Sequence, residues 1–382
     1  MTRLALTAER VLAGDAFRRD VAVVIEGSNI TAILDRDALP HDIPLDDLGP
    51  GILAPGLIDL QVNGGGGVLL NETPTVEGVR AIAEAHRCYG TTGLLPTVIT
   101  DTPEVMRAAT DSVRDARRQG VPGVLGIHIE GPFIDPKRKG AHDPRYIRRP
   151  SEEDIAWLTG LDCGVVYLTL APNMVDLDIV RRLAKTGIVV SLGHSEATSL
   201  EALAALRAGA RGFTHLFNAM SQLTGRAPGM VGAALSAREA WCGLIADGEH
   251  VDEIALRAAL AAKRPGTLVL VSDAMPSAAD GPDAFRLQGR EVRVRNGRLE
   301  LMDGTLAGAT ITLIDAVRFA YRRLDLNLEE ALRMASQYPA EAIGLGASLG
   351  RLAPGYDATF VHLSDGLEVL RTWTLGRSSQ EI

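Results

Sequence analysis

Gly126-Ile-His-Ile-Glu-Gly-Pro132 contains an apolar run that leads to the carboxylate of Glu130, and it is one of four similar runs that point to the same fold. The other three are Leu192-Gly-His-Ser195, Thr214-His-Leu-Phe-Asn-Ala-Met220 and Val271-Ser-Asp-Ala274. In α/β folds, the loops at the carboxyl ends of parallel strands carry the chemistry, while the buried strand bodies only pack. Two imidazoles and two carboxylates at four such ends indicate a candidate metal hydrolase site.

Apolar runs of strand length recur along the chain, bounded by Gly, Pro or Asn. They are Gly56–Val62, Gly93–Ile99, Val124–Glu130, Val165–Leu170, Ile188–His194, Gly212–His215, Cys242–Asp247 and Leu268–Asp273. Segments with helical period lie between most of them, for example at Val76–Tyr89 and Glu104–Gln119. We therefore predict an α/β protein built on a parallel (β/α)8 barrel of the TIM type. A doubly wound open sheet is the structural alternative.

The glycine run Asn63-Gly-Gly-Gly-Gly67 follows the first predicted strand. It lacks the G-x-G-x-x-G spacing of a dinucleotide-binding turn, which weakens the doubly wound alternative. Two interpretations stay open: the glycines let the backbone pass close to a metal or substrate, or they make a tight loop.

Each end of the chain has a region with strand patterns and no helical segment. We expect residues 1–50 and 350–382 to join in one small β-sandwich domain, and residues 51–349 to form the barrel. A β-hairpin insertion is expected at about residues 285–306, with its turn at Asn296-Gly297. The terminal strand patterns lie at residues 21–34, 358–363 and 367–374.

Composition narrows the class of protein. Hydrophobic residues make up 46% of the 382 residues and charged ones 23%, which is typical of a globular protein and not of a disordered or membrane one. A net charge of -9 argues against nucleic acid or an anionic membrane as partner, since both need a basic surface. The amino terminus lacks a signal-peptide core, so we expect a cytoplasmic protein. The three cysteines have no short spacing and are expected to be buried free thiols.

Glu130, His194 and His215 end the third, fifth and sixth predicted strands. A closed barrel points them toward one axis, and two imidazoles with a carboxylate suit a catalytic divalent metal such as zinc. Such a metal lowers the pKa of a bound water, and a free carboxylate nearby can remove and return protons. Asp273 ends the eighth strand and is placed for that role; the alternative is an N-cap of whatever follows.

Several longer motifs accompany these residues. They are Pro55-Gly-Leu-Ile-Asp-Leu-Gln-Val-Asn-Gly64, His128-Ile-Glu-Gly-Pro132, Lys139-Gly-Ala-His-Asp-Pro144, Thr224-Gly-Arg-Ala-Pro-Gly229, Ala246-Asp-Gly-Glu-His250, Met334-Ala-Ser-Gln-Tyr-Pro-Ala340 and Leu349-Gly-Arg-Leu-Ala-Pro-Gly355. With the four strand-end motifs, they make the chain resemble the N-acetylglucosamine-6-phosphate deacetylases of the amidohydrolase superfamily nearly from end to end.

The resemblance implies hydrolysis of the acetamido group of N-acetyl-D-glucosamine 6-phosphate to D-glucosamine 6-phosphate and acetate. It implies that Glu130, His194 and His215 hold the metal and that Asp273 acts first as base and then as acid. His142, on a lid loop, would polarise the amide carbonyl and help to hold the oxyanion. The other residues that the resemblance places near the metal or the substrate are Gln61, Asn218, Ala219, Arg226, His250, Leu306, Ala307 and Gly308.

Two departures from the wider superfamily bear on the metal. Many relatives carry H-x-H after the first strand and a bridging lysine at the fourth, whereas this chain has Gln61-Val-Asn63 and Leu170-Ala-Pro-Asn173. We therefore expect one divalent metal per active site, zinc first, with Fe2+ or another ion as alternatives. The family forms dimers, so we expect a homodimer in which some phosphate ligands come from the neighbouring subunit.

Two other functions stay open. The chain could be another amidohydrolase that acts on an N-acyl or cyclic amide without a phosphate, and Arg226 and His250 are the residues that discriminate. It could also be a non-catalytic sugar-phosphate sensor. The complete ligand set and Asp273 argue against a sensor, because a binding module does not require them.

Overall fold

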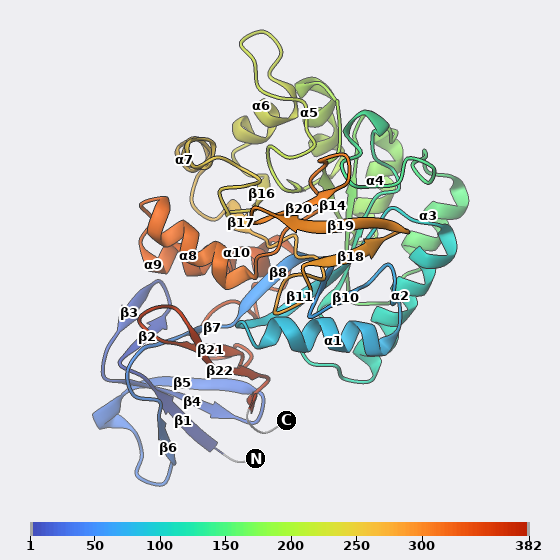
Figure 1. Ribbon diagram of the computed structural model, residues 1–382. Coiled ribbons are helices and arrows are strands. Elements are labelled where there is room, and N and C mark those ends of the chain that lie inside the picture. The colour runs from blue at the N-terminus through green and yellow to red at the C-terminus, as the bar shows by residue number, and fades with distance from the viewer. Residues whose placement is uncertain (1–2, 380–382) are drawn as a thin grey trace.

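Eight parallel strands form a barrel in the computed structural model, which describes residues 3–379 (Figure 1). Each strand pairs with the next one along the chain, and a bridge between Val62 and Ala274 joins the first strand to the segment after the last. The strands are β8 (Leu57–Val62), β11 (Thr91–Ile99), β12 (Gly126–Glu130), β13 (Val165–Leu170), β14 (Val189–Leu192), β15 (Gly212–Phe213), β16 (Trp241–Leu244) and β17 (Leu268–Leu270). The predicted TIM-type barrel is confirmed.

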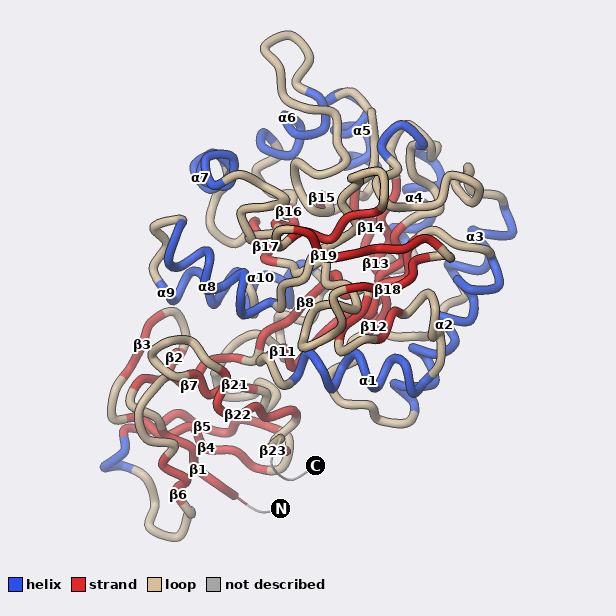
Figure 2. The backbone as a smooth tube through the Cα atoms, in the orientation of Figure 1, coloured by secondary structure: helices blue, strands red, loops and turns tan. Residues whose placement is uncertain are grey.

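Helices cover the outside of the barrel (Figure 2). In α2, the Thr102 side chain caps the first turn by accepting from the Val105 amide, and buried Met106, Ala109 and Val113 recur three and four residues apart. The two helical segments named from the sequence, Val76–Tyr89 and Glu104–Gln119, correspond to α1 and α2. The helices are α1 (Val76–Arg87), α2 (Pro103–Arg118), α3 (Glu152–Thr159), α4 (Leu177–Lys185), α5 (Ser199–Ala208), α6 (Gly229–Ser236), α7 (Glu253–Ala262), α8 (Leu313–Arg323), α9 (Leu328–Met334) and α10 (Gln337–Ala342).

Both ends of the chain form two sheets beside the barrel (Figure 1). Leu53 and Phe360 come from opposite ends of the chain and are packed in one buried cluster with Leu6 and Val23. One sheet has the order β5 (Asn29–Asp35), β4 (Val21–Glu26), β1 (Arg3–Thr7) and β6 (Leu45–Asp47). The other has the order β23 (Arg377–Ser378), β22 (Val369–Thr374), β21 (Phe360–Leu363), β7 (Ile52–Pro55), β2 (Arg10–Ala13) and β3 (Ala16–Arg18).

A three-stranded antiparallel sheet is inserted after the last barrel strand. Its strands are β18 (Ala284–Leu287), β19 (Arg290–Arg295) and β20 (Arg298–Leu301). Asn296 and Gly297 join β19 to β20 with φ values of 52° and 83°, the backbone that a tight hairpin turn requires. The structure has one strand more than the predicted hairpin, because Leu287 of β18 is buried with the apolar side chains of β19 and β20.

The glycine run after β8 makes a tight loop. β9 (Gly64–Gly65) pairs with β10 (Val68–Leu69), and Gly66 and Gly67 between them have φ values of 57° and 87°. This geometry is the second of the two interpretations left open by the sequence.

The cysteines are all free, as expected, but only Cys163 and Cys242 are buried. Cys88 is exposed, so the expectation of three buried thiols was wrong at this position, which is the C-cap of α1.

Among residues 3–379, the structure contains no helix with the length and apolar character needed to cross a membrane.

Candidate metal centre and its cavity

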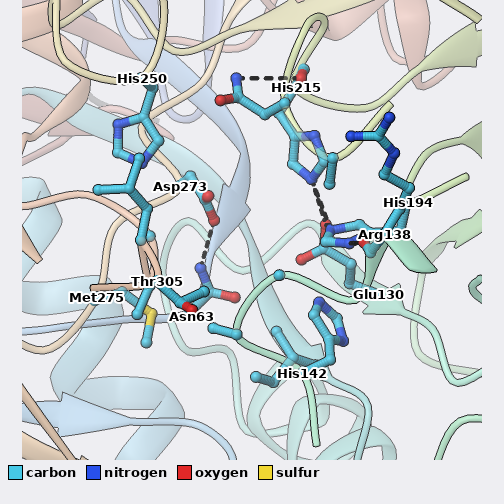
Figure 3. Close-up of a pocket in the computed structure, with 18 of the residues that line it drawn as sticks. Asn63, Glu130, Arg138, His142, His194, His215, His250, Asp273, Met275 and Thr305 are labelled. Carbon is cyan, nitrogen blue, oxygen red and sulfur yellow. Dashed lines mark hydrogen bonds and ion pairs between the residues drawn. The ribbon is translucent and has the colours of Figure 1, made fainter. Parts of the chain in front are cut away.

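A cavity of about 370 Å³ opens at the carboxyl end of the barrel. Residues that follow the barrel strands line it from one side, and Leu287 of the inserted sheet and Thr305 line it from another. The segment that follows η2 (Pro136–Arg138) contributes His142 (Figure 3). The cavity therefore lies where the strand-end motifs predicted a site.

Three side chains from three strand ends converge on one point. Oε1 of Glu130 lies 2.9 Å from Nε2 of His215 and 3.2 Å from Nε2 of His194, and the two Nε2 atoms lie 2.9 Å apart. All three residues are buried, and their ligand atoms lie within 4.8 Å of one another. Figure 3 shows the carboxylate and the two rings facing one another. The structure thus brings together the three residues that the sequence predicted as metal ligands.

This donor set fits a divalent cation. Nδ1 of His194 donates to the backbone carbonyl of Arg138 at 2.8 Å, so the lone pair of Nε2 is free to face the shared point. Gln61 donates through Nε2 to both oxygens of Glu130 at 3.2 Å and orients that carboxylate. Two imidazole nitrogens and a carboxylate oxygen are ligands that zinc and similar cations accept, with positions left open for substrate.

The backbone is held in an unusual conformation at these positions. His194, His215 and Asp273 have φ values of 46°, 31° and 51°, in the left-handed region that side chains with a Cβ rarely adopt. Each follows the end of a short barrel strand. Such strain concentrates at functional sites, and here it turns three side chains toward the cavity where the strands end.

Asp273 lies next to the three ligands. Its Oδ1 accepts from Nδ2 of Asn63 at 2.7 Å and from Nε2 of Gln61 at 3.0 Å, and the same Gln61 nitrogen contacts Glu130. Burial and the charge of Glu130 raise the pKa of Asp273 to about 6. A carboxyl group near this value can both accept and return a proton at neutral pH. In the part of the chain that the structure describes, no helix starts directly after Asp273, so the N-cap alternative was wrong.

His142 is buried against the same centre. Its ring packs edge-on against the ring of His194, with 4.5 Å between centroids. Nδ1 of His142 lies 2.8 Å from Oγ1 of Thr100. Burial lowers the pKa of His142 well below its usual value, so the ring is neutral and only one of its nitrogens carries a proton.

His250 provides a buried basic group in the same cavity. Its Nδ1 donates to Oδ2 of Asp247 at 2.6 Å, while Nε2 is buried without a hydrogen-bond partner among residues 3–379. Burial alone would lower the pKa of His250, but the hydrogen bond and charge of Asp247 outweigh it and raise that pKa. A cationic ring with a free N–H suits an anionic ligand.

The remaining predicted substrate residues divide into three groups. Arg226 is exposed on the loop before α6 and does not line the cavity of its own chain. Gln61 is not among the residues that line the cavity, but its Nε2 donates to Glu130 and to Asp273. Those that line the cavity are Asn218, Ala219, Leu306, Ala307 and Gly308.

Sequence reasoning missed several residues of the site. Asn63 holds Asp273, and its place in the Gln61-Val-Asn63 motif was the available signal. Lys137 and Arg138 line the cavity within a basic loop whose pattern also fits a solvated surface. Thr100 carried no signal at all, because its contact with His142 joins positions 42 residues apart.

Comparisons with known proteins agree on one group of enzymes. The model of the Amidohydrolase family matches residues 52–378. The chain is 45% identical to the N-acetylgalactosamine-6-phosphate deacetylase of Shewanella sp. (strain ANA-3), over 88% of this chain and 85% of that protein.

Solved structures give the same result. The N-acetylglucosamine-6-phosphate deacetylase from Pasteurella multocida matches with a TM-score of 0.95 and 36% identity, over 99% of both chains. A mutant of the N-acetyl-D-glucosamine-6-phosphate deacetylase from Mycobacterium smegmatis, in complex with N-acetyl-D-glucosamine-6-phosphate, matches with a TM-score of 0.91 and 31% identity, over 99% of both chains.

Proposed function

Because the chain belongs to the amidohydrolase family, we propose that it hydrolyses the acetamido group of N-acetyl-D-glucosamine 6-phosphate to D-glucosamine 6-phosphate and acetate. One observation carries the proposal: a single cavity holds a Glu-His-His donor set, a carboxyl group with a pKa of about 6 and a basic imidazole. Similarity to named deacetylases over 99% of the chain supports it.

Glu130, His194 and His215 would hold one divalent cation, for which we propose zinc, with Fe2+ as the alternative. When bound, the cation supplies a Lewis acid that polarises the amide carbonyl and lowers the pKa of water. The positions at the end of the first strand that would supply imidazole ligands to a second cation are occupied by Gln61 and Asn63, whose amide groups donate to Asp273. This supports a single cation per chain.

Asp273 moves the proton in this proposal. Its carboxylate takes a proton from the attacking water as the new C–O bond forms at the carbonyl carbon. It then gives that proton to the amide nitrogen as the C–N bond breaks, so the amine leaves as a neutral group. The two hydrogen bonds to Oδ1 leave Oδ2 available for this exchange.

His142 is proposed to donate a hydrogen bond from Nε2 to the carbonyl oxygen. That oxygen gains negative charge as the tetrahedral intermediate forms, and a donor already in place stabilises it. Loss of one such donor typically costs about 3 kcal/mol of the barrier reduction.

His250 is proposed to bind the 6-phosphate through Nε2, supported by its raised pKa and its unpartnered nitrogen. The exposed position of Arg226 supports a homodimer in which this arginine reaches the phosphate in the neighbouring subunit's cavity. Mixing two variants tests this arrangement. We expect the Arg226→Ala homodimer and the His250→Asn homodimer each to be impaired. If Arg226 acts across the interface, a heterodimer of the two variants contains one intact site and part of the activity returns; if Arg226 acts within its own chain, the heterodimer stays impaired.

N-acetyl-D-galactosamine 6-phosphate is a second candidate substrate. The Shewanella relative, at 45% identity, is named for that sugar. The two sugars differ only in the configuration at C4, away from both the acetamido group and the phosphate. Both candidates therefore need the same metal, proton-transfer and phosphate groups, and a comparison of kcat/KM separates them.

Acetate release from a panel of acetylated hexosamines tests the proposed function. We expect turnover of the phosphorylated sugars, weak or no turnover of N-acetylglucosamine without phosphate, and loss of activity after chelation. Equal turnover with and without the phosphate would support an amidohydrolase of a different substrate class. Binding of the phosphorylated sugars without acetate release would support a sensor.

A cytoplasmic location is part of the proposal. Cys88, Cys163 and Cys242 are free thiols, the state that reducing compartments maintain. Cell fractionation should recover the deacetylase activity with the cytosol, and recovery from a secreted fraction would contradict this location.

A further inference from the structure

We infer that Thr100 is a positioning residue that decides which ring nitrogen of His142 carries the proton. Its hydroxyl donates to Nδ1 and thereby holds the ring in the tautomer with hydrogen on Nε2. The inference rests on the proposed role of His142 as the donor to the substrate carbonyl. Thr100 itself touches neither the proposed cation nor the substrate.

The Thr100 hydroxyl has two neighbours that can accept its hydrogen. Thr100 follows β11 and is fully buried, with Oγ1 lying 2.8 Å from Nδ1 of His142 and 3.4 Å from the backbone oxygen of Glu130. A hydroxyl has one hydrogen to donate, and 3.4 Å is long for an O–H···O bond. The proposed role of His142 needs the ring hydrogen on Nε2, so we assign the hydroxyl hydrogen to Nδ1.

The other ring nitrogen is free for a ligand. Within residues 3–379, Nε2 of His142 has no hydrogen-bond partner, and His142 lines the cavity. A neutral ring that accepts at Nδ1 must carry its hydrogen on Nε2. If Nδ1 carried the hydrogen instead, Nε2 would present a lone pair to the carbonyl oxygen and repel the charge that develops there.

The inserted sheet contacts the backbone of Thr100 and of Ala141, the residue that precedes His142. Gln288 donates through Nε2 to the carbonyl oxygen of Thr100 at 2.6 Å, and Arg290 donates to the carbonyl oxygen of Ala141 at 2.6 Å. Gln288 and Gly289 have φ values of 51° and 77°, the backbone of a tight two-residue turn between β18 and β19. These contacts fix the backbone of Thr100 and of the residue that precedes His142.

Close packing also keeps the Thr100 side chain in place. A Cβ added to Gly131 would lie 2.0 Å from Oγ1 of Thr100, so the hydroxyl sits directly against that glycine. Thr100 is therefore held from its backbone side by Gln288 and from its side-chain face by Gly131. A side chain larger than that of glycine at position 131 would displace the hydroxyl.

Three variants of the metal-loaded enzyme test the inference. Thr100→Val keeps the shape of the side chain and removes the hydroxyl, whereas Thr100→Ser keeps the hydroxyl. Thr110→Val is the matched control: Thr110 is buried in α2, and its hydroxyl donates to the Arg107 backbone oxygen at 2.8 Å, far from the cavity in the fold. Folding and metal content of each variant are checked by thermal denaturation and elemental analysis.

Kinetics gives the first readout. For Thr100→Val we expect kcat to fall about tenfold to hundredfold with KM changed by less than about twofold, because the lost interaction acts on the transition state. Thr100→Ser and Thr110→Val should keep kcat within about threefold of the parent enzyme. A Thr100→Val enzyme with parental kcat, or a Thr100→Ser enzyme as slow as Thr100→Val, would overturn the inference.

The second readout does not depend on activity. In ¹⁵N-histidine-labelled protein, with His142 assigned by comparison with His142→Gln, we expect Nδ1 to have the shift of an unprotonated nitrogen and Nε2 that of a protonated one. In Thr100→Val this pattern should become a mixture of tautomers. A wild-type spectrum with the proton on Nδ1 overturns the inference even if the enzyme is an active deacetylase. The expected spectrum in a protein without deacetylase activity would instead contradict only the proposed function.

Discussion

Nδ2 of Asn63 donates to Oδ1 of Asp273 at 2.7 Å, across the seam where the first and last strands of the barrel meet. The Asn63 and Gly64 backbone amides donate to the Ala274 carbonyl oxygen at 2.9 and 3.0 Å at the same seam. The contact that closes the barrel and the contact that orients the proposed base are thus neighbours. The end of the first barrel strand thus supplies an amide that holds a carboxylate.

Replacing Asn63 with Leu tests this orientation. We expect kcat to fall by about tenfold or more, because a buried carboxylate loses a charge-assisted hydrogen bond worth roughly 1.5–3 kcal/mol. The metal content should not change, since Asn63 contacts none of the three proposed ligands in the described structure. Steady-state kinetics with elemental analysis measures both. Loss of the metal would show that Asn63 supports the centre in another way.

Asp273→Asn should remove turnover and keep the metal. The amide is nearly the same size as the carboxyl group, but it cannot accept and return a proton. In the parent enzyme, kcat/KM should fall as pH drops through about 6, because the raised pKa of Asp273 means that the group ionises only above it. The charge of a bound cation would move this limb to lower pH. Substantial turnover in the Asn variant would refute the proposed proton transfer.

His250→Asn should raise KM for the phosphorylated sugar about tenfold to hundredfold, the range expected for a lost hydrogen bond to a charged group. Asp247 raises the pKa of His250, so the imidazolium persists to higher pH than in water, and KM should rise once pH exceeds that pKa. Asp247→Asn should move this rise to lower pH. A sugar without phosphate is the control, because its KM should respond to neither change; an equal response would argue against phosphate binding at His250.

Removal of the cation should also lower the melting temperature. A ligand that binds only the folded state stabilises that state, and Glu130, His194 and His215 meet at one point only when the barrel is closed. Differential scanning calorimetry before and after chelation measures the change. A single melting temperature for both samples, with the cation confirmed as removed, would contradict binding at this point.

The barrel and its centre could be predicted because their signals are local. Glu130, His194, His215 and Asp273 each stand where an apolar run ends, and the rule that strand ends share one rim brings them together without knowledge of any contact. The α6 helix gives only a weak sequence signal, because its segment Gly229–Ser236 is apolar on nearly all sides and has no side-chain N-cap.

The supporting contacts could not be predicted from the same signals. Thr100 and His142 lie in segments that are far apart in the sequence, and Gln288 and Arg290 of the inserted sheet contact the backbone of both segments. The positive φ values of His194 and His215 follow from packing that periodicity does not report. Arg226 lies in the Thr224–Gly229 motif, but the sequence of one chain does not specify whether its side chain acts in the cavity of that chain or in that of a neighbouring subunit.

Titration of the metal-depleted protein with Zn2+, with bound metal and acetate release measured in the same samples, shows whether turnover depends on one cation per chain. We predict that both rise together and reach a plateau at one cation per chain, and that His215→Ala gains neither. Acetate release that stays complete without any metal, or a plateau at two cations per chain, would contradict a single cation held by Glu130, His194 and His215.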